Sequence, residues 1–529
     1  MFCFPVATWI GNAAAVLDGC WGAVSQRAQE VGCSRAAVYQ QSRRVEQAVA
    51  REQSRGPRDD EVCAEHQRLR AENEALWAVW SATEELPEAK QQAFAATGSA
   101  MGLSLTQIVT LLAIIMAQRR VPSRATVGRW VAQANERAGG ILTVLDRACQ
   151  ALVMMLCLEE IFFHHDPVLV AVEPHSMAWV AGQRGPDRTG ETWCALLKAW
   201  PNVERVVSDA GTGLARGVKL WNEARATAST DLEQNASEPV QSGLDVFHTE
   251  HEMQRVVSRR WAGAAKRLET ASKADEQVPK AKRYGIDARA AAGRARQAWN
   301  QAERVFDHAE QAEQAMARIK AALALRRPDG QRNDRAWAQQ QITDTMDELE
   351  GDEWGKVRRL LGDVRTLNHL DGMHEQLAHA VPESLLREAV TRLRYWRGHM
   401  ERTHGIRQAQ ATPLVIEAQM LCQRLSPEWP TAYARVGHIL HHTVRASSAV
   451  ECMNSVLRMH QGRHRHVSQG MLDLKRVFWN CRPFLHGKRR GACPYQLLGL
   501  NLPTDDWWEL LQMEPETLRQ KLSTQEVAA

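Results

Sequence analysis

Residues 152–174 read Leu-Val-Met-Met-Leu-Cys-Leu-Glu-Glu-Ile-Phe-Phe-His-His-Asp-Pro-Val-Leu-Val-Ala-Val-Glu-Pro, and this stretch decides the fold. It holds two apolar runs, Leu152–Phe163 and Pro167–Pro174, on either side of a turn-like His-His-Asp segment. A third run, Ser176–Ala181, follows directly. Short apolar runs bounded by turn residues are typical of strands. The sequence therefore predicts a three-stranded antiparallel meander.

The segments after the meander alternate between helical and strand-like patterns. We expect a helix over Thr192–Ala199, a buried strand over Val203–Ser208, a helix over Gly211–Asn222 and a strand over Leu244–Phe247. Three antiparallel strands followed by helix, strand, helix and strand is the order of an RNase H-like core. The expected fold class is thus an α/β RNase H-like core with a mixed sheet.

A large all-helical insertion follows that core. Residues from about 250 to 440 are rich in Ala, Glu, Gln, Arg and Leu, and they carry helical patterns almost throughout. The clearest helices are expected at Ala288–Leu325, Asp334–Asp347, Trp354–Leu367, Leu370–Val381 and Ser384–His399. The pattern resumes after the insertion at Ala446–His460, Met471–Trp479 and Asp505–Met513.

Two N-terminal segments have a helix-turn-helix pattern. In residues 22–50 a helix breaks at Gly32 and Ser34 can cap a second one; in residues 103–136 the helix Leu105–Gln118 is broken by Arg119–Pro122, and Ser123 can cap the next helix. The second helix of such a motif enters the major groove of DNA. The arginines expected to contact DNA there are Arg35, Arg43, Arg44, Arg124 and Arg129. The alternative is that both motifs are ordinary packed helical hairpins.

A polar stretch, 54–60, has linker composition. The next segment, 61–80, spaces Val62, Leu69 and Leu76 by seven residues, which suits either a short dimerising coiled coil or one amphipathic helix. These patterns divide the chain into the following segments: 1–58, first helix-turn-helix; 59–150, helical linker and second helix-turn-helix; 151–254, first part of the core; 255–440, insertion; 441–500, last core helices; 501–529, tail.

Composition bounds the function classes only broadly. The chain has 529 residues, 44% hydrophobic and 24% charged, with a net charge of +4, so DNA binding would depend on local basic faces. Its 11 cysteines include no CxxC pair, which favours a reduced cytoplasmic location. The N-terminus lacks the pattern of a signal peptide, and the most apolar stretch, Ile108–Met116, is too short to span a bilayer.

Acidic residues at the ends of the predicted strands carry the candidate chemistry. Asp209 closes Val203–Ser208, Glu159 lies on the central strand, and Glu451 lies on a late helix. Two divalent cations that cut a phosphodiester need carboxylates from several elements. We expect Glu159, Asp209 and Glu451 to bind two Mg²⁺ or Mn²⁺ ions. Glu160 points to the opposite face of the strand, and Asp166 lies at the hairpin tip.

Three further residues are expected to support that site: Asp245, His248 and Asn454. Alternatives remain for these positions. Asp209 could cap the next helix, Asp245 and His248 could be a structural polar pair, and Ser448-Ala-Val-Glu451 fits a capping box that would only start a helix.

A basic tract follows Glu451. Its residues Arg458, Arg463, Arg465, Lys475 and Arg476 are expected to bind the phosphate backbone. The tract could instead be a solvated basic face. Trp261 and Trp396 lie among arginines, where core packing is favoured over stacking on an unpaired base.

The chain resembles bacterial insertion-sequence transposases of the DDE/D class. The resemblance rests on Leu158–Phe163, Pro167–Pro174, Val207–Leu214, Ser447–Ser455, Phe478–Asn480 and Pro494–Gly499. The helical insertion, together with Asp245-x-x-His248, is similar to the wider class that includes hAT and Mutator transposases.

The resemblance implies an enzyme that cuts and joins DNA at the terminal inverted repeats of a mobile element. It places Asp209 and Glu451 at the second and third catalytic positions, and Glu159 at the first, where the family usually has Asp. It also implies double-stranded DNA as partner, a dimer or larger oligomer, and a location at the bacterial nucleoid. Because Glu is one methylene longer than Asp, the alternative is a transposase-derived DNA-binding protein with impaired catalysis. A metal-dependent nuclease without joining activity would use the same site.

Overall fold

The computed structural model describes residues 5–18, 22–53, 64, 66–74, 86–116, 121–230, 238–462 and 466–526. The chain divides into two compact units, each of which is continuous in space but not in sequence. Unit 1 comprises Met1–Val79, Glu250–Ala321 and Gln341–Val357. Unit 2 comprises Trp80–Thr249, Ala322–Gln340 and Arg358–Ala529. The predicted insertion is therefore shared between the units.

Unit 2 is built on a five-stranded mixed sheet. Its strands are β1 (Met155–Phe163), β2 (Asp166–Glu173), β3 (Ala178–Arg184), β4 (Arg205–Ser208) and β5 (Gln241–Leu244). The order across the sheet is β3-β2-β1-β4-β5. β1, β2 and β3 pair antiparallel, while β4 and β5 run parallel to β1. The predicted meander and the strand before Asp209 are confirmed.

One predicted strand was misplaced. The strand expected over 244–247 ends at Leu244, and α10 (Val246–Arg283) begins two residues later. The backbone N–H of Phe247 donates to Oδ1 of Asp245, which accepts at the start of this helix. His248 therefore lies on the first turn of α10 rather than on a strand.

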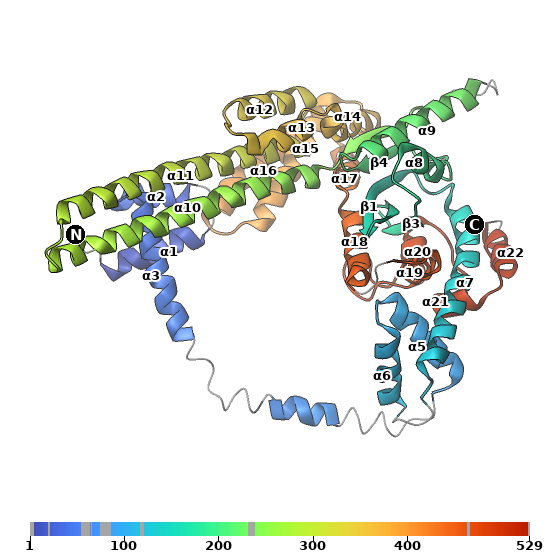
Figure 1. The fold of residues 1–529 in the computed structure, drawn as a ribbon. Coiled ribbons are helices and arrows are strands. Elements are labelled where there is room, and N and C mark those ends of the chain that lie inside the picture. Colours follow the sequence, from blue (N-terminus) through green and yellow to red (C-terminus); the bar gives the residue numbers. More distant parts are fainter. Residues whose placement is uncertain are drawn as a thin grey trace. The chain divides into compact units, whose positions relative to one another are not determined.

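Each face of the sheet is covered by helices that form a separate apolar core. On one face, Leu156 and Leu158 of β1 pack with α7 (Arg124–Cys149), α8 (Gly190–Leu197) and α9 (Thr212–Thr230). On the other face, Cys157 and Ile161 pack with α18 (Ser448–Gln461). α19 (Gln469–Cys481) contributes to both cores. We call these the α7 face and the α18 face; Figure 1 shows the helices around the strands.

Further helices of unit 2 include α5 (Glu88–Ala100) and α6 (Leu105–Ile115). The second predicted cap is confirmed, because the side chain of Ser123 accepts from the Thr126 N–H at the start of α7. The region predicted as one helix over 354–367 is interrupted. It contains η1 (Asp352–Trp354), α13 (Gly355–Leu361) and η2 (Val364–Leu367), since the side chain of Asp363 caps a new turn.

Four other helices lie close to their predicted ranges: α12 (Arg335–Asp347), α14 (Asn368–Ala380), α15 (Ser384–Arg402) and α21 (Trp507–Gln512). The insertion also contains α16 (Ile406–Leu425) and α17 (Trp429–His442), in a region expected to be helical without separate ranges. Two C-terminal helices were not predicted: α20 (Pro494–Leu498) and α22 (Pro515–Glu526). None of the described helices combines the length and apolar content that crossing a bilayer requires.

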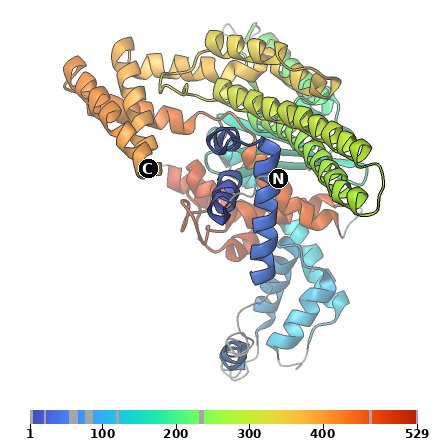
Figure 2. The ribbon, with the colours of Figure 1, turned by 90° about the vertical axis from the view of Figure 1, so that its left-hand side faces the viewer.

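Unit 1 contains a three-helix N-terminal bundle and a long helical hairpin. The bundle consists of α1 (Val6–Leu17), α2 (Ala23–Val31) and α3 (Arg35–Gln53). The hairpin consists of α10 and α11 (Ala288–Leu323), which run side by side in both ribbon views (Figures 1 and 2). Buried alanines, such as Ala264 of α10 and Ala309 of α11, provide small side chains where the two helices pack together. The break at Gly32 is confirmed, with a φ of +66° that suits glycine.

The predicted linker and half of the predicted coiled-coil segment, including Val62 and Leu76, lie outside the described residues, as do Gln118, Arg119, Arg120, Arg463, His464 and Arg465.

Candidate active site

The register of the sheet brings three acidic residues to one edge. β1 pairs with β4 through Leu158 and Ser208, and β4 pairs with β5 through Ser208 and Leu244. The next residue on each chain is acidic: Glu159, Asp209 and Asp245. Because paired residues of parallel strands share a face, these three positions are neighbours on one face of the sheet.

That face is the α18 face, which helix α18 covers. Residues of β1 with odd numbers, such as Cys157 and Ile161, pack with Val450 and Met453 of α18. Glu159 has the same parity, so it lies beneath the helix that carries Glu451. The structure therefore places Glu159, Asp209, Asp245 and Glu451 on the same face of the sheet, although they are separated by up to 292 positions in the sequence.

The pKa of Glu159 reflects the carboxylates around it. Burial and the negative charges of Glu451, Asp209 and Asp245 together raise this pKa to about 8, while Arg458 opposes them. Its Oε2 is buried and finds no hydrogen-bond donor among the described residues. Adjacent carboxylates disfavour one another's ionised form. A bound cation would remove that conflict.

Asp245 is the most buried of these acids, with 3% of its surface exposed. Its Oδ2 accepts a hydrogen bond from the hydroxyl of Ser447, the residue before α18. The backbone is tied at the same place, since the N–H of Val246 donates to the carbonyl of Arg445 at 2.9 Å. These two bonds fix the start of α18 against the end of β5.

The capping-box alternative for Glu451 is wrong. The N-cap of α18 is Ser447 and makes no side-chain hydrogen bond to its own helix, because its hydroxyl is used on Asp245. Glu451 instead forms an ion pair with Arg458, two turns along the same helix, at 3.2 Å. Asn454 lies between them on that face, 1% exposed, and its Oδ1 has no donor among the described residues.

Asp209 makes one of the hydrogen bonds expected of a residue that caps the next helix. Its Oδ1 accepts from the backbone N–H of Gly211 at 2.9 Å, just before α9. The side chain is half-buried.

Glu160 occupies the opposite face, as the sequence predicts. Its Oε1 accepts from the indole N–H of Trp193 at 2.9 Å, and Arg188 lies 3.6 Å from Oε2. Asp166, at the hairpin tip, pairs with Arg184 and His466. His248 is half-buried on the first turn of α10.

The residues present suit a divalent cation in chemistry but do not form a closed site. Carboxylate oxygens are the ligands that Mg²⁺ prefers, and the unpaired Oε2 of Glu159 is an available ligand atom. However, within the described part of the chain no three His, Cys, Asp or Glu side chains converge closely enough to hold a metal ion. These carboxylates thus form an open cluster, and a cation would have to pull their side chains inward to be held by three of them.

Two of the predicted DNA-binding residues are buried, so neither can contact DNA in this structure. Lys475 is 2% exposed; its Nζ donates to the carbonyl of Ala100 at 2.6 Å, and burial lowers its pKa to about 7. Arg476 is 6% exposed and donates to Asp146 and to the carbonyls of Trp179 and Val180. Residues are buried all round α19, including Leu474 and Val477. The apolar residues on either side of Lys475 and Arg476 in the sequence are the signal that these two cations, unlike the exposed Arg458, are buried.

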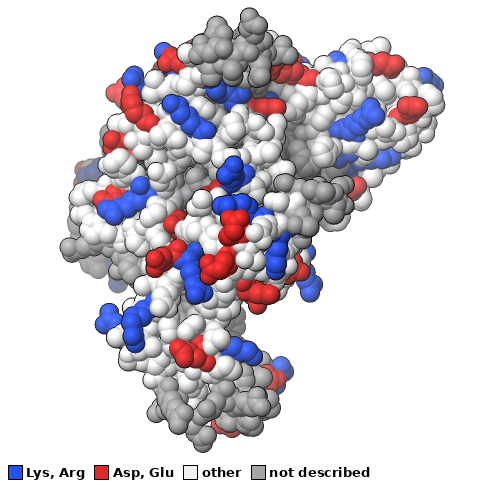
Figure 3. Space-filling view, turned by 90° about the vertical axis from the view of Figure 1, so that its right-hand side faces the viewer, with Lys and Arg blue, Asp and Glu red and all other residues white. Residues whose placement is uncertain are grey.

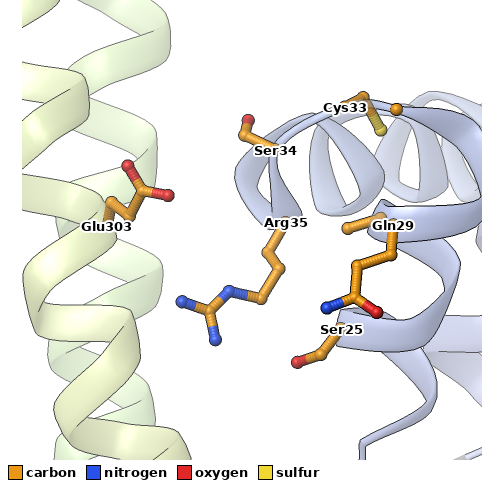
Figure 4. Close-up of a pocket in the computed structure, with 8 residues that line it drawn as sticks. Ser25, Gln29, Cys33, Ser34, Arg35 and Glu303 are labelled. Carbon is orange, nitrogen blue, oxygen red and sulfur yellow. The ribbon is translucent and has the colours of Figure 1, made fainter.

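The first predicted recognition helix, α3, packs within unit 1. Arg35 extends toward α11 (Figure 4) and pairs there with Asp307 and Glu310. Tyr39 contacts Trp261 and Phe306, which confirms core packing for Trp261. Arg43 is exposed, and Arg44 is exposed with its guanidinium 5.6 Å from the ring centre of Trp9.

In the second motif, Arg124 and Arg129 are exposed on the first two turns of α7. The C-terminal half of α7 is a core helix that includes Leu142 and Leu145. On the face of the molecule in Figure 3, basic and acidic side chains are interspersed rather than gathered by sign.

Comparison with known proteins identifies no relative: no family model, no curated protein and no solved structure matches this chain.

Proposed function

We propose that this protein is a metal-dependent transposase that cleaves DNA strands at the ends of a mobile element and joins them to target DNA. The observation that carries the proposal is the alignment of Glu159, Asp209 and Asp245 at successive register positions of β1, β4 and β5, beneath the helix that carries Glu451. The strand order, with three antiparallel strands and then two parallel ones, supports an RNase H-like core.

Each residue would have a distinct role. Glu159, Asp209 and Glu451 would supply the oxygens that hold Mg²⁺ or Mn²⁺. Bound there, the ions would activate a water or 3′-hydroxyl and stabilise the leaving oxygen. Asp245 would position α18 through Ser447, and Arg458 would compete with the metal for Glu451 until the cation displaces it. His248 and Asn454 would contact the substrate's phosphate or order its water.

The test is strand cleavage of a labelled duplex carrying the element's own end, in Mg²⁺ or Mn²⁺. Wild type should cut, and Asp209→Asn should not. Asp166→Asn is the matched control, because it makes the same change at the hairpin tip, and it should cut like wild type. Cleavage that survives Asp209→Asn, or is lost equally in the control, would contradict the assignment.

A second function, DNA binding by a transposase-derived protein without catalysis, is favoured by the open arrangement of the carboxylates. It predicts that wild type binds the element end but does not cut it. If Glu159→Asp then restores cutting, the chain is an impaired transposase. If no variant cuts despite tight binding, catalysis should be abandoned.

A further inference from the structure

The turn of the α10–α11 hairpin concentrates positive charge in unit 1. Residues 277–297 contain six Lys or Arg and a single acidic residue, Asp287. The basic residues are Lys280, Lys282 and Arg283 in the last turn of α10, and Arg289, Arg294 and Arg296 in α11. All six are exposed. We call this surface the α10–α11 tip.

No carboxylate in the described part of the chain pairs with the cations of the α10–α11 tip. None of the six side chains forms an ion pair with a described carboxylate, whereas other cations of unit 1 do, such as Arg260 with Glu353 and Arg318 with Glu348. The one acid at the tip is already used, because Oδ1 of Asp287 accepts the N–H groups of Arg289 and Ala290 at 3.0 Å. The charge is therefore available to a partner.

Helix stability explains only half of this pattern. Cations in the last turn of a helix interact favourably with its dipole, which accounts for Lys280, Lys282 and Arg283. Arg289 lies in the first turn of α11, where a positive charge is unfavourable and where no helical acid compensates it. A partner of opposite charge accounts for both halves of the tip.

A glycine opens the helix surface between two of these arginines. Gly293 is four residues after Arg289 and three before Arg296, so the three share one face of α11. A Cβ at Gly293 would have no atom within 4 Å, so no packing contact requires glycine there. Glycine inside a helix costs about 1 kcal/mol relative to alanine. The result is a shallow spot with an arginine on each side.

We propose that the α10–α11 tip binds the phosphate backbone of double-stranded DNA. Four of its six cations are arginines, whose planar guanidinium groups match phosphate geometry. Arg289 and Arg296 are about 10 Å apart along the helix, at 1.5 Å per residue, which is close to the width of the major groove. Exposed Tyr284 and Ile286 in the turn offer too little apolar surface for a stable lipid anchor.

This surface adds a DNA contact to the proposed function but shares no residue with the carboxylate site. Its test is binding without metal, so its failure is distinguishable from a failure of cleavage. Fluorescence polarisation would follow a labelled duplex of about 30 base pairs in EDTA across a salt series, with the full-length protein. The variants are Lys280→Gln/Lys282→Gln and Arg289→Gln/Arg296→Gln. The matched control is Lys198→Gln/Lys219→Gln, which removes two exposed lysines from unit 2.

Each tip variant should weaken binding about tenfold at moderate salt and reduce the slope of log affinity against log salt by about 2, or about 0.9 for each lost phosphate contact. The control should leave both within error. Tip variants that bind like the control would overturn the proposal. So would unchanged DNA binding combined with lost binding to vesicles containing phosphatidylserine, which would assign the tip to an anionic membrane.

A second pair of variants tests the close approach at Gly293 without changing charge. Gly293→Leu should weaken DNA binding several-fold while raising helix content or leaving it unchanged. Gly263→Leu, at the other open helical glycine of the hairpin, is its control and should bind normally. Equal binding by both would exclude a backbone contact at that spot.

Discussion

In the described part of the chain, buried charged side chains have hydrogen-bond partners on one face of the sheet and lack some of them on the other. On the α7 face, Glu160 accepts from Trp193, Arg476 bonds Asp146, and Lys475 donates to a backbone carbonyl. On the α18 face, Glu159 is surrounded by other carboxylates, and one of its oxygens has no donor among the described residues. Structural ions have protein partners, whereas a buried carboxylate oxygen without a described donor, such as Oε2 of Glu159, suits an external ligand. Parity along β1 alone separates the two environments.

The largest difference should appear between single substitutions at the adjacent residues Glu159 and Glu160 of β1. In the cleavage assay, Glu159→Gln should lower the rate at least about a hundredfold, the scale of losing one electrostatic contact to the reacting groups. Glu160→Gln should stay near wild type, because its amide oxygen can still accept from Trp193. Equal losses would show that the two faces do not differ in function.

The buried charges of the α7 face can be tested through the pH dependence of stability. Burial lowers the pKa of Lys475 to about 7, while in the unfolded chain it is about 10.4. Between these values only the unfolded state binds the proton, so stability rises with pH, by at most about 1.4 kcal/mol per unit. Lys475→Met should remove this slope in urea titrations at roughly pH 7, 8 and 9. A slope unchanged in Lys475→Met would show that the ammonium is solvated.

Stability without metal should differ in size between the faces. In EDTA at neutral pH, Glu159→Gln should raise the free energy of unfolding by about 1–2 kcal/mol, because burial and the neighbouring carboxylates both disfavour its ionised form. Glu160→Gln should raise it less, because burial also raises the pKa of Glu160 but its Oε1 accepts a hydrogen bond from Trp193. Thermal unfolding of both variants measures the contrast, and equal shifts would contradict it.

The smallest effect concerns the link between β5 and α18. Ser447→Ala removes the donor to buried Asp245 and should cost about 1 kcal/mol of stability. Ser448→Ala, at the exposed neighbouring serine, is the control and should cost less. If the two variants unfold alike in urea, Ser447 does not hold α18 in place.

The sequence predicts much of the sheet because its signals are local. Apolar runs with turn residues between them locate the meander, and strand alternation places Glu159 and Glu160 on opposite faces. The register that aligns Glu159 with Asp209 and Asp245 depends on the pairing of strands that are far apart in the sequence, and no local pattern specifies it. The same holds for Lys475 and Arg476, whose basic character predicts DNA contact although the packing around α19 buries them. Arg35 likewise has its partners on α11, which lie more than 270 positions away.

β5 is an outer strand of the sheet, and η2 and α14 of the insertion pack against it. The amide of Asn368, which follows η2, donates to the carbonyl of Ser242 at 2.7 Å, where a further strand would otherwise pair. An exposed strand edge is a template for self-association. The insertion thus covers this edge of the sheet, and a core shortened by joining Val246 to Arg445 should aggregate through β5.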